Sequence, residues 1–176
     1  MLAFDIETTG LGEADTITAA CAFDPSRNIE RTFIFSQGGD PHEFIALLDE
    51  ADVLCAFNGV RFDIPFMQKE WKLSDSRVHV WVAKLVDVYE MAMLVFRRGF
   101  SLNQLLIANK IDVKTGTGKE AIELAHRGAW AELGEYCMQD TKKTHAVTSL
   151  AKIITPLSFP TYKVELHNLC FRMVET

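Results

Sequence analysis

The pattern of apolar and polar positions along the chain alternates between strand-like and helix-like stretches. Short apolar runs bounded by turn residues predict strands, which lie at 2–6, 16–23, 31–35, 53–57 and 84–88. Apolar residues at helical spacing predict helices, which lie at 41–51, 63–72, 120–126 and 130–154, with a further helix beginning after Ser101. The stretch between the helix at 63–72 and the strand at 84–88 is less regular in its pattern. This order predicts an α/β domain whose mixed central sheet combines an antiparallel meander with parallel strands and is flanked by helices.

Turn and capping residues mark some of these boundaries. Ser101 and Gln104 form a capping box, in which the two residues satisfy each other's backbone N–H groups at a helix start. Gly128 is expected to end the helix at 120–126, and Pro156 to end the long helix that begins at Trp130.

The chain has 176 residues, which suits one domain with its own core. We expect that domain to span residues 1–176, with a core at 1–154 and a C-terminal extension at 155–176. Within the extension, 162–166 has two interpretations, an added strand or part of a disordered tail.

Composition narrows the class of protein. No segment reaches the roughly 18 unbroken apolar residues of a membrane helix, and the first residues have no basic region typical of a signal peptide. The four cysteines are far apart in the sequence and form no C-x-x-C pair, which argues against a zinc site and favours reduced thiols in an intracellular protein. The net charge of −6 argues against a strong non-specific nucleic-acid binder. It leaves room for an enzyme that holds a few terminal nucleotides through bound cations.

Two carboxylates share one face of the first strand. The period of two in Phe4-Asp5-Ile6-Glu7 puts Phe4 and Ile6 on one face, and Asp5 and Glu7 on the other. Adjacent like charges repel one another unless a cation compensates them. Taken alone, the pair favours a solvated acidic turn after a strand.

A third carboxylate lies within the apolar stripe of the long helix. Asp140 falls between Cys137 and Thr144 of that stripe, where an unpaired carboxylate should be costly. Tyr136 lies four residues earlier, so its hydroxyl shares a helix face with Asp140. The alternative is a tyrosine–aspartate hydrogen bond at the edge of the core.

The fourth acid, Asp63, has a plausible structural role. It precedes a helical pattern and is a candidate N-cap, while Asn58 belongs to the turn dipeptide Asn58-Gly59. If all four carboxylates converged, they would form the oxygen-rich cage that Mg²⁺ or Mn²⁺ accepts. Two such cations can activate a water and stabilise the leaving oxygen of a phosphodiester.

Three segments together resemble a known family. They are residues 4–11 (FDIETTGL), 58–66 (NGVRFDIPF) and 136–140 (YCMQD). In order and spacing they resemble the three motifs of the DnaQ-like DEDD 3′–5′ exonucleases, which have a ribonuclease-H-like fold, and the second motif is similar to that of family B DNA polymerase proofreading domains. The resemblance covers roughly residues 1–154. Because Glu135 stands where one branch has histidine, Tyr136 places the chain with the tyrosine (DEDDy) branch.

The resemblance implies roles for the acids. Asp5, Glu7 and Asp140 would hold one divalent cation, Mg²⁺ or Mn²⁺, and Asp5 would bridge to a second cation supported by Asp63. Tyr136, with Glu7, would position the attacking water.

The resemblance also implies contacts to the terminal nucleotide, made by Thr8, Leu11, Asn58 and Phe62. For Leu11 and Phe62, ordinary core packing stays as an alternative. The implied reaction is hydrolysis of single-stranded DNA from its 3′ end, by a two-metal-ion mechanism that releases nucleoside 5′-monophosphates. The alternatives are a 3′–5′ exoribonuclease, or a catalytically inactive nucleic-acid-binding or scaffold domain. Whether the chain works with a polymerase or another protein partner stays open.

Two further features are set aside on their chemistry. Residues 114–120 echo a phosphate-binding loop, but Val113 stands where its first glycine belongs and Glu120 where its Mg²⁺-binding Ser or Thr belongs. A solvated surface is the favoured interpretation of this stretch, with a flexible basic glycine-rich segment near the substrate as the alternative. Asp87, at the end of a strand, is interpreted as structural rather than as a fifth metal ligand.

Overall fold

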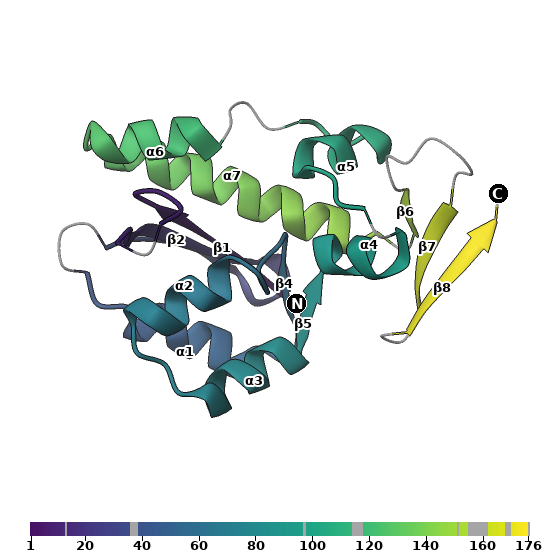
Figure 1. Ribbon diagram of the computed structural model, residues 1–176, viewed down its shortest axis with the longest axis horizontal. Helices are drawn as coiled ribbons and strands as arrows, with labels where there is room; N and C mark the ends of the chain where they lie inside the picture. Colours follow the sequence, from purple (N-terminus) through teal and green to yellow (C-terminus); the bar gives the residue numbers. More distant parts are fainter. Residues whose placement is uncertain are drawn as a thin grey trace.

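The computed structural model (Figure 1) describes residues 1–12, 14–35, 39–96, 98–113, 118–150, 152–154, 162–167 and 170–175. Side chains are described as far as residue 150, except for 95 and 96. None of the helices in this part of the chain is long and apolar enough to cross a membrane.

A five-stranded sheet forms the centre of the domain, in the order β3-β2-β1-β4-β5. The first three strands, β1 (Leu2–Thr8), β2 (Ile17–Asp24) and β3 (Ile29–Ile34), are antiparallel. A 3₁₀ turn, η1 (Pro25–Arg27), joins β2 to β3. The strands β4 (Leu54–Ala56) and β5 (Leu85–Asp87) then extend the sheet in parallel to β1. This arrangement confirms the predicted mixed sheet, with its antiparallel meander and parallel strands.

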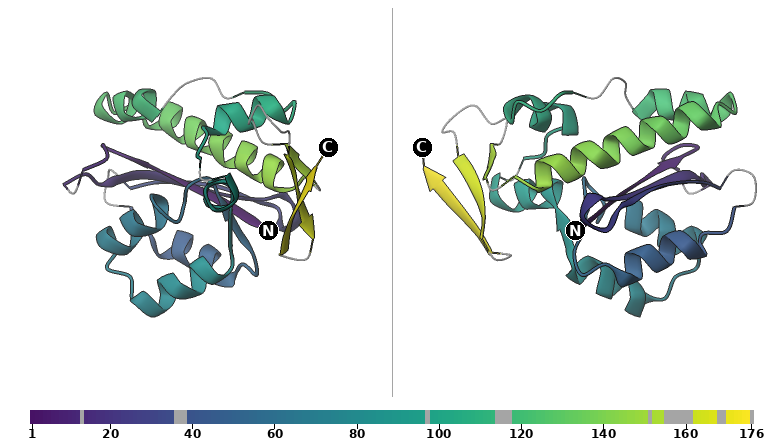
Figure 2. Two further views of the ribbon diagram at one scale, coloured as in Figure 1. Left: turned by 45° about the vertical axis from the view of Figure 1, so that its right-hand side comes forward. Right: turned by 180° about the vertical axis from the view of Figure 1, so that it is seen from behind.

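Different helices cover the two faces of this sheet (Figures 1 and 2). The long helix α7 (Trp130–Thr148) crosses one face, and α6 (Gly118–His126) packs beside it. On the other side lie α1 (His42–Glu50), α2 (Asp63–Glu70) and α3 (Asp75–Ala83). Phe4 and Ile6 of β1 belong to the main core cluster with residues of α1 and α2, so that Asp5 and Glu7 face α7.

Two predicted helix boundaries are confirmed. The capping box of Ser101 and Gln104 starts α5 (Leu102–Ala108). Gly128, at φ 68°, ends α6 in the left-handed conformation that a residue without a Cβ adopts most readily.

The structure corrects the sequence analysis in three places. The less regular stretch contains α3, whose N-cap is Ser74. Only Trp81 of that helix is buried, so its apolar periodicity is weak. A further helix, α4 (Val88–Phe96), follows β5 directly. The long helix ends at Thr148 rather than near residue 154.

The third correction arises because Lys152–Ile154 forms the strand β6, whose apolar residues suit a strand as well as a helix. This strand pairs antiparallel with β7 (Tyr162–His167), and β7 pairs with β8 (Cys170–Glu175). Of the two interpretations of 162–166, the structure therefore favours the added strand. Pro156 lies outside the described residues.

Candidate active site

Asp5 and Glu7 project from β1 toward α7, as the strand period predicted. Asp5 is paired across the sheet with Cys21 of β2. Cys137 of α7 lies over Asp5, with its Sγ 3.6 Å from the Asp5 carbonyl oxygen and 3.9 Å from Asp5 Oδ2. The candidate ligand atoms of Asp5, Glu7 and Cys137 all lie within 4.8 Å of one another. From the sequence, Cys137 was expected only as a member of the apolar stripe of the long helix, although its position three residues before Asp140 was a usable signal.

Asp63 joins this group from the start of α2. It is the first residue of that helix, the N-cap position belongs to Phe62, and no side-chain cap bond is made there. The Asp63 carboxylate instead accepts the backbone N–H of Ile6 at 3.0 Å, with only 2% of the residue exposed. The N-cap interpretation of Asp63 is therefore wrong, and the residue ties α2 to β1 next to Asp5.

Asp140 and Tyr136 approach from α7. Asp140 is buried and Tyr136 is half-buried. Both line a cleft of about 320 Å³, to which α6 also contributes. The expected shared helix face of Tyr136 and Asp140 is thus the wall of a cavity.

The electrostatics of the group follow from burial and like charge. Burial raises the pKa of Asp5 well above its usual value, and the charges of Asp63, Glu7 and Asp140 raise that pKa further. Burial also raises the pKa of Asp63, to about 7. The carboxylates of Glu7, Asp63 and Asp140, from β1, α2 and α7, are therefore close enough to Asp5 to oppose its ionisation. We call Asp5, Glu7, Asp63 and Asp140 the carboxylate cluster.

A divalent cation fits the donor chemistry of this cluster. Carboxylate oxygens are the ligands that Mg²⁺ and Mn²⁺ prefer. A bound cation would also offset the like charges that raise the pKa of Asp5. Burial raises the pKa of the neighbouring Cys137 thiol well above its usual range, so without a cation this side chain is neutral.

The four residues expected to contact a nucleotide lie in different environments. Leu11 is 77% exposed, so the core-packing interpretation is wrong for this residue. Phe62 packs against the main core cluster and beside Phe66, with ring centroids 4.9 Å apart. Thr8 is buried and donates its hydroxyl to the Gly10 carbonyl at 2.6 Å. Asn58 adopts φ 67°, and its buried Oδ1 has no hydrogen-bond partner among the described residues.

Asp87 organises the second motif without belonging to the cluster. Its carboxylate accepts the backbone N–H groups of Asn58 and Val60, each at 3.0 Å. It also accepts those of Tyr89 and Glu90, at 3.0 and 3.2 Å. This bonding agrees with the structural role expected for Asp87. The basic stretch at 114–117 lies outside the described residues.

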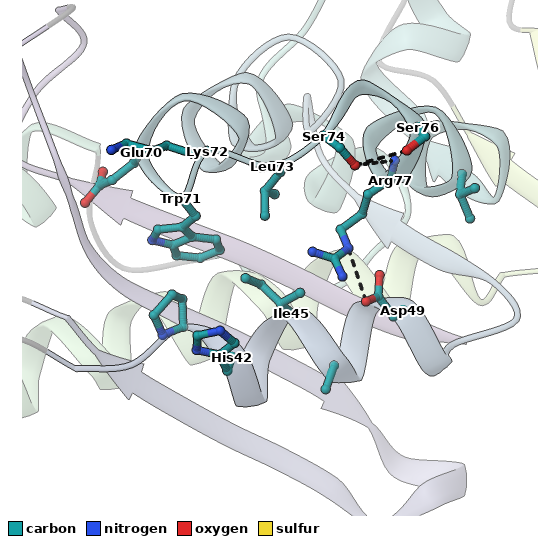
Figure 3. A pocket seen from close by; sticks show the side chains of 13 residues that line it. His42, Ile45, Asp49, Glu70, Trp71, Lys72, Leu73, Ser74, Ser76 and Arg77 are labelled. Atoms are coloured by element: carbon teal, nitrogen blue, oxygen red, sulfur yellow. Dashed lines mark hydrogen bonds and ion pairs between the residues drawn. The ribbon is translucent and has the colours of Figure 1, made fainter.

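A larger cavity, of about 1020 Å³, lies away from the carboxylate cluster (Figure 3). It is bordered by α1, the α2–α3 turn and α3, with Ile45, Trp71 and Leu73 at its centre. The Arg77 guanidinium in this cavity pairs with Asp49 at 3.3 Å. None of the motif acids lines it, so size alone does not locate the chemistry of this protein.

Comparisons with known proteins agree with this architecture. Residues 2–151 match the family described as the RNase_H superfamily. No curated protein matches the chain. A similar solved structure is that of the family B DNA polymerase from the hyperthermophilic archaeon Pyrobaculum calidifontis, with a TM-score of 0.65 and 19% sequence identity over 84% of this chain. The match spans 24% of the polymerase chain, and at this identity it shows a shared fold. Because the family match covers most of its length, the chain belongs to the RNase H superfamily.

Proposed function

We propose that the protein is a metal-dependent 3′–5′ exonuclease that hydrolyses single-stranded DNA to nucleoside 5′-monophosphates. The observation that carries this proposal is the convergence of Asp5, Glu7, Asp63 and Asp140 beside a cleft that Tyr136 also lines. Membership in the RNase H superfamily supports nuclease chemistry.

The roles proposed for the acids are those that the resemblance to the DEDD exonucleases implies, and the closeness of the acids supports them. Asp5, Glu7 and Asp140 would hold one divalent cation, and Asp63, which bonds to β1 next to Asp5, would support a second. The cations, when bound, activate water and stabilise the leaving oxygen. The buried surroundings strengthen every electrostatic interaction in the site, because little water is present to screen it.

Tyr136 and residues of the first and second motifs are proposed to act on the substrate. Tyr136 lines the same cleft as Asp140, which suits its hydroxyl to positioning the attacking water. The exposed Leu11 and the ring of Phe62 are proposed to contact the bases of the terminal nucleotides. Thr8 and Asn58 are proposed to contact the terminal nucleotide itself, and the buried Oδ1 of Asn58 is an acceptor suited to a ligand.

DNA is proposed as the substrate rather than RNA on two grounds. The second motif resembles that of polymerase proofreading domains, and the similar solved structure is a DNA polymerase. Because the chain matches about a quarter of that polymerase, a role in proofreading with a partner is a separate question from the reaction itself.

The test is degradation of single-stranded DNA and RNA oligonucleotides labelled at either end, with Mg²⁺ or Mn²⁺ and with a chelator. We expect metal-dependent stepwise shortening from the 3′ end, faster on DNA. Faster shortening of RNA would make the protein an exoribonuclease. If neither polymer is cleaved while a divalent cation demonstrably binds, the exonuclease proposal is wrong and a nucleic-acid-binding domain replaces it.

A further inference from the structure

The cleft between α6 and α7 has an acidic rim. Besides Tyr136 and Asp140, it is lined by the exposed glutamates Glu120, Glu132 and Glu135. A strand of nucleic acid carries a negative charge at each phosphate, so these glutamates repel it. The approach of a substrate to the carboxylate cluster therefore needs a compensating positive group.

Arg127 is the one cationic side chain that lines this cleft in the part of the chain that the structure describes. It is exposed, and it forms no ion pair with any described residue. Other arginines of the domain are already paired with carboxylates; these are Arg27, Arg31, Arg61 and Arg77. The guanidinium of Arg127 is thus available to an anionic ligand.

The position of Arg127 is fixed by the way α6 ends. Gly128, at φ 68°, donates its N–H to the Ala125 carbonyl, and Ala129 donates to the Leu124 carbonyl. These two bonds form a Schellman motif, with Arg127 at the C-cap. The Trp130 N–H then bonds to the Gly128 carbonyl as α7 begins. The backbone of Arg127 is therefore fixed by hydrogen bonds at the turn between α6 and α7, beside the helix that carries Tyr136 and Asp140.

We propose that Arg127 binds a backbone phosphate of the single-stranded substrate as the strand enters the cleft between α6 and α7. A guanidinium presents a planar fork of donors that matches two phosphate oxygens. A single cation within an acidic rim binds one phosphate. It therefore positions the strand but does not supply the many phosphate contacts that tight binding of long nucleic acid needs. This inference rests on the proposed function, because it assumes a nucleic-acid substrate.

A structural role for Arg127 has a different signature. A cation at the C-terminus of a helix interacts favourably with the helix dipole, and its loss would lower the melting temperature only slightly. A phosphate contact, in contrast, changes the salt dependence of binding, because each neutralised phosphate of a single strand contributes about 0.7 to the slope of log K against log salt.

The test measures binding of fluorescent single-stranded DNA to the full chain with Mg²⁺ at several salt concentrations. An Asp5→Asn background prevents cleavage during the measurement. Arg127→Gln removes the charge, Arg127→Lys keeps the charge without the fork, and Arg77→Gln is the control in the cavity of Figure 3. We expect Arg127→Gln to weaken binding about 10- to 100-fold and to lower the salt slope by about 0.7. Arg127→Lys should recover the slope but only part of the affinity.

Kinetics without the Asp5→Asn change supply a second readout, in which the loss of kcat/KM for Arg127→Gln should fall mainly on KM. The inference is wrong if Arg127→Gln binds DNA with the affinity and slope of the Arg77→Gln control. It is equally wrong if only the melting temperature changes. Cleavage by the wild type with these results would leave the exonuclease proposal standing. Failure of the wild type both to bind and to cleave DNA would overturn both proposals.

Discussion

Two regions of this domain bury carboxylates, and they stabilise them in different ways. At the junction of β5 and α4, Asp87 is almost fully buried and accepts four backbone N–H groups. In the carboxylate cluster, Asp63 accepts the N–H of Ile6, and Asp5 has three other acids as its charged neighbours. Backbone N–H groups of the fold therefore stabilise the charged form of Asp87. In the cluster the same fold brings like charges together, which a cation would relieve.

The difference shows how a functional acid is distinguished from a structural one. Burial raises the pKa of both Asp87 and Asp5, so a raised pKa does not separate them. The identity of the neighbours does, because backbone donors favour the charged form of a carboxylate while other carboxylates oppose it. Asp87 thus shapes the loop that carries Asn58, and the cluster is the proposed place of chemistry.

The largest expected effect comes from matched substitutions that test the difference between the two regions. Asp140→Asn or Asp5→Asn should lower the rate of hydrolysis by more than about 10³-fold, because each removes a charged ligand of the proposed cations. Neither should lower the melting temperature of the metal-free protein, since each removes a like charge from a crowded site.

Asp87→Asn is the matched control for that experiment. It removes the charge and replaces one acceptor oxygen with an NH2 group that faces backbone N–H donors, so it should lower the free energy of unfolding by about 2–4 kcal/mol. Urea denaturation followed by circular dichroism measures both effects. Similar destabilisation by Asp140→Asn and Asp87→Asn would remove the distinction between the two regions.

Tyr136→Phe tests the part of the cleft beside the cluster, because it removes only the hydroxyl oxygen of Tyr136. We expect kcat to fall by roughly 10²–10⁴-fold if the hydroxyl positions the attacking water. The melting temperature should change little, because the half-buried ring keeps its packing. An unchanged kcat would assign Tyr136 to packing against Leu124 and the other residues of its small core cluster.

The last expected effect is a pH dependence of stability. The pKa of Asp63 is about 7 in the folded protein, against a usual value of 3.8, so the folded state holds this proton more tightly than the unfolded chain does. The free energy of unfolding of the wild type, relative to Asp63→Asn, should therefore fall as pH rises from about 4 to about 7.

Subtracting the free energy of unfolding of Asp63→Asn from that of the wild type cancels the contributions of Asp15 and Asp24. The pKa values of these two residues are lowered, so their contributions to stability are lost as pH falls. Urea denaturation across this pH range, in chelator, measures the difference. Saturating Mg²⁺ should raise the stability of the wild type and reduce its fall with pH, because the cation binds the ionised cluster. A pH-independent difference in chelator would mean that Asp63 ionises normally in the folded protein.

The local sequence pattern determined the faces of β1 and two of the helix ends. The period of two along β1 placed Phe4 and Ile6 in the core and Asp5 and Glu7 on the opposite face, and the structure confirms this division. The capping box at Ser101 and the stop at Gly128 were equally readable, because caps and left-handed turns depend on a few adjacent residues.

Tertiary structure decided what local pattern left ambiguous. Lys152–Ile154 suited a helix or a strand, and pairing with β7 made it a strand. Asp63 satisfied the local rule for an N-cap, yet its carboxylate bonds to Ile6, which is 57 positions away. The closeness of Cys137 to Asp5 and the place of Arg127 in the cleft also depend on packing between distant segments. Sequence spacing fixes which face a side chain occupies, but only the packing of elements fixes what that face meets.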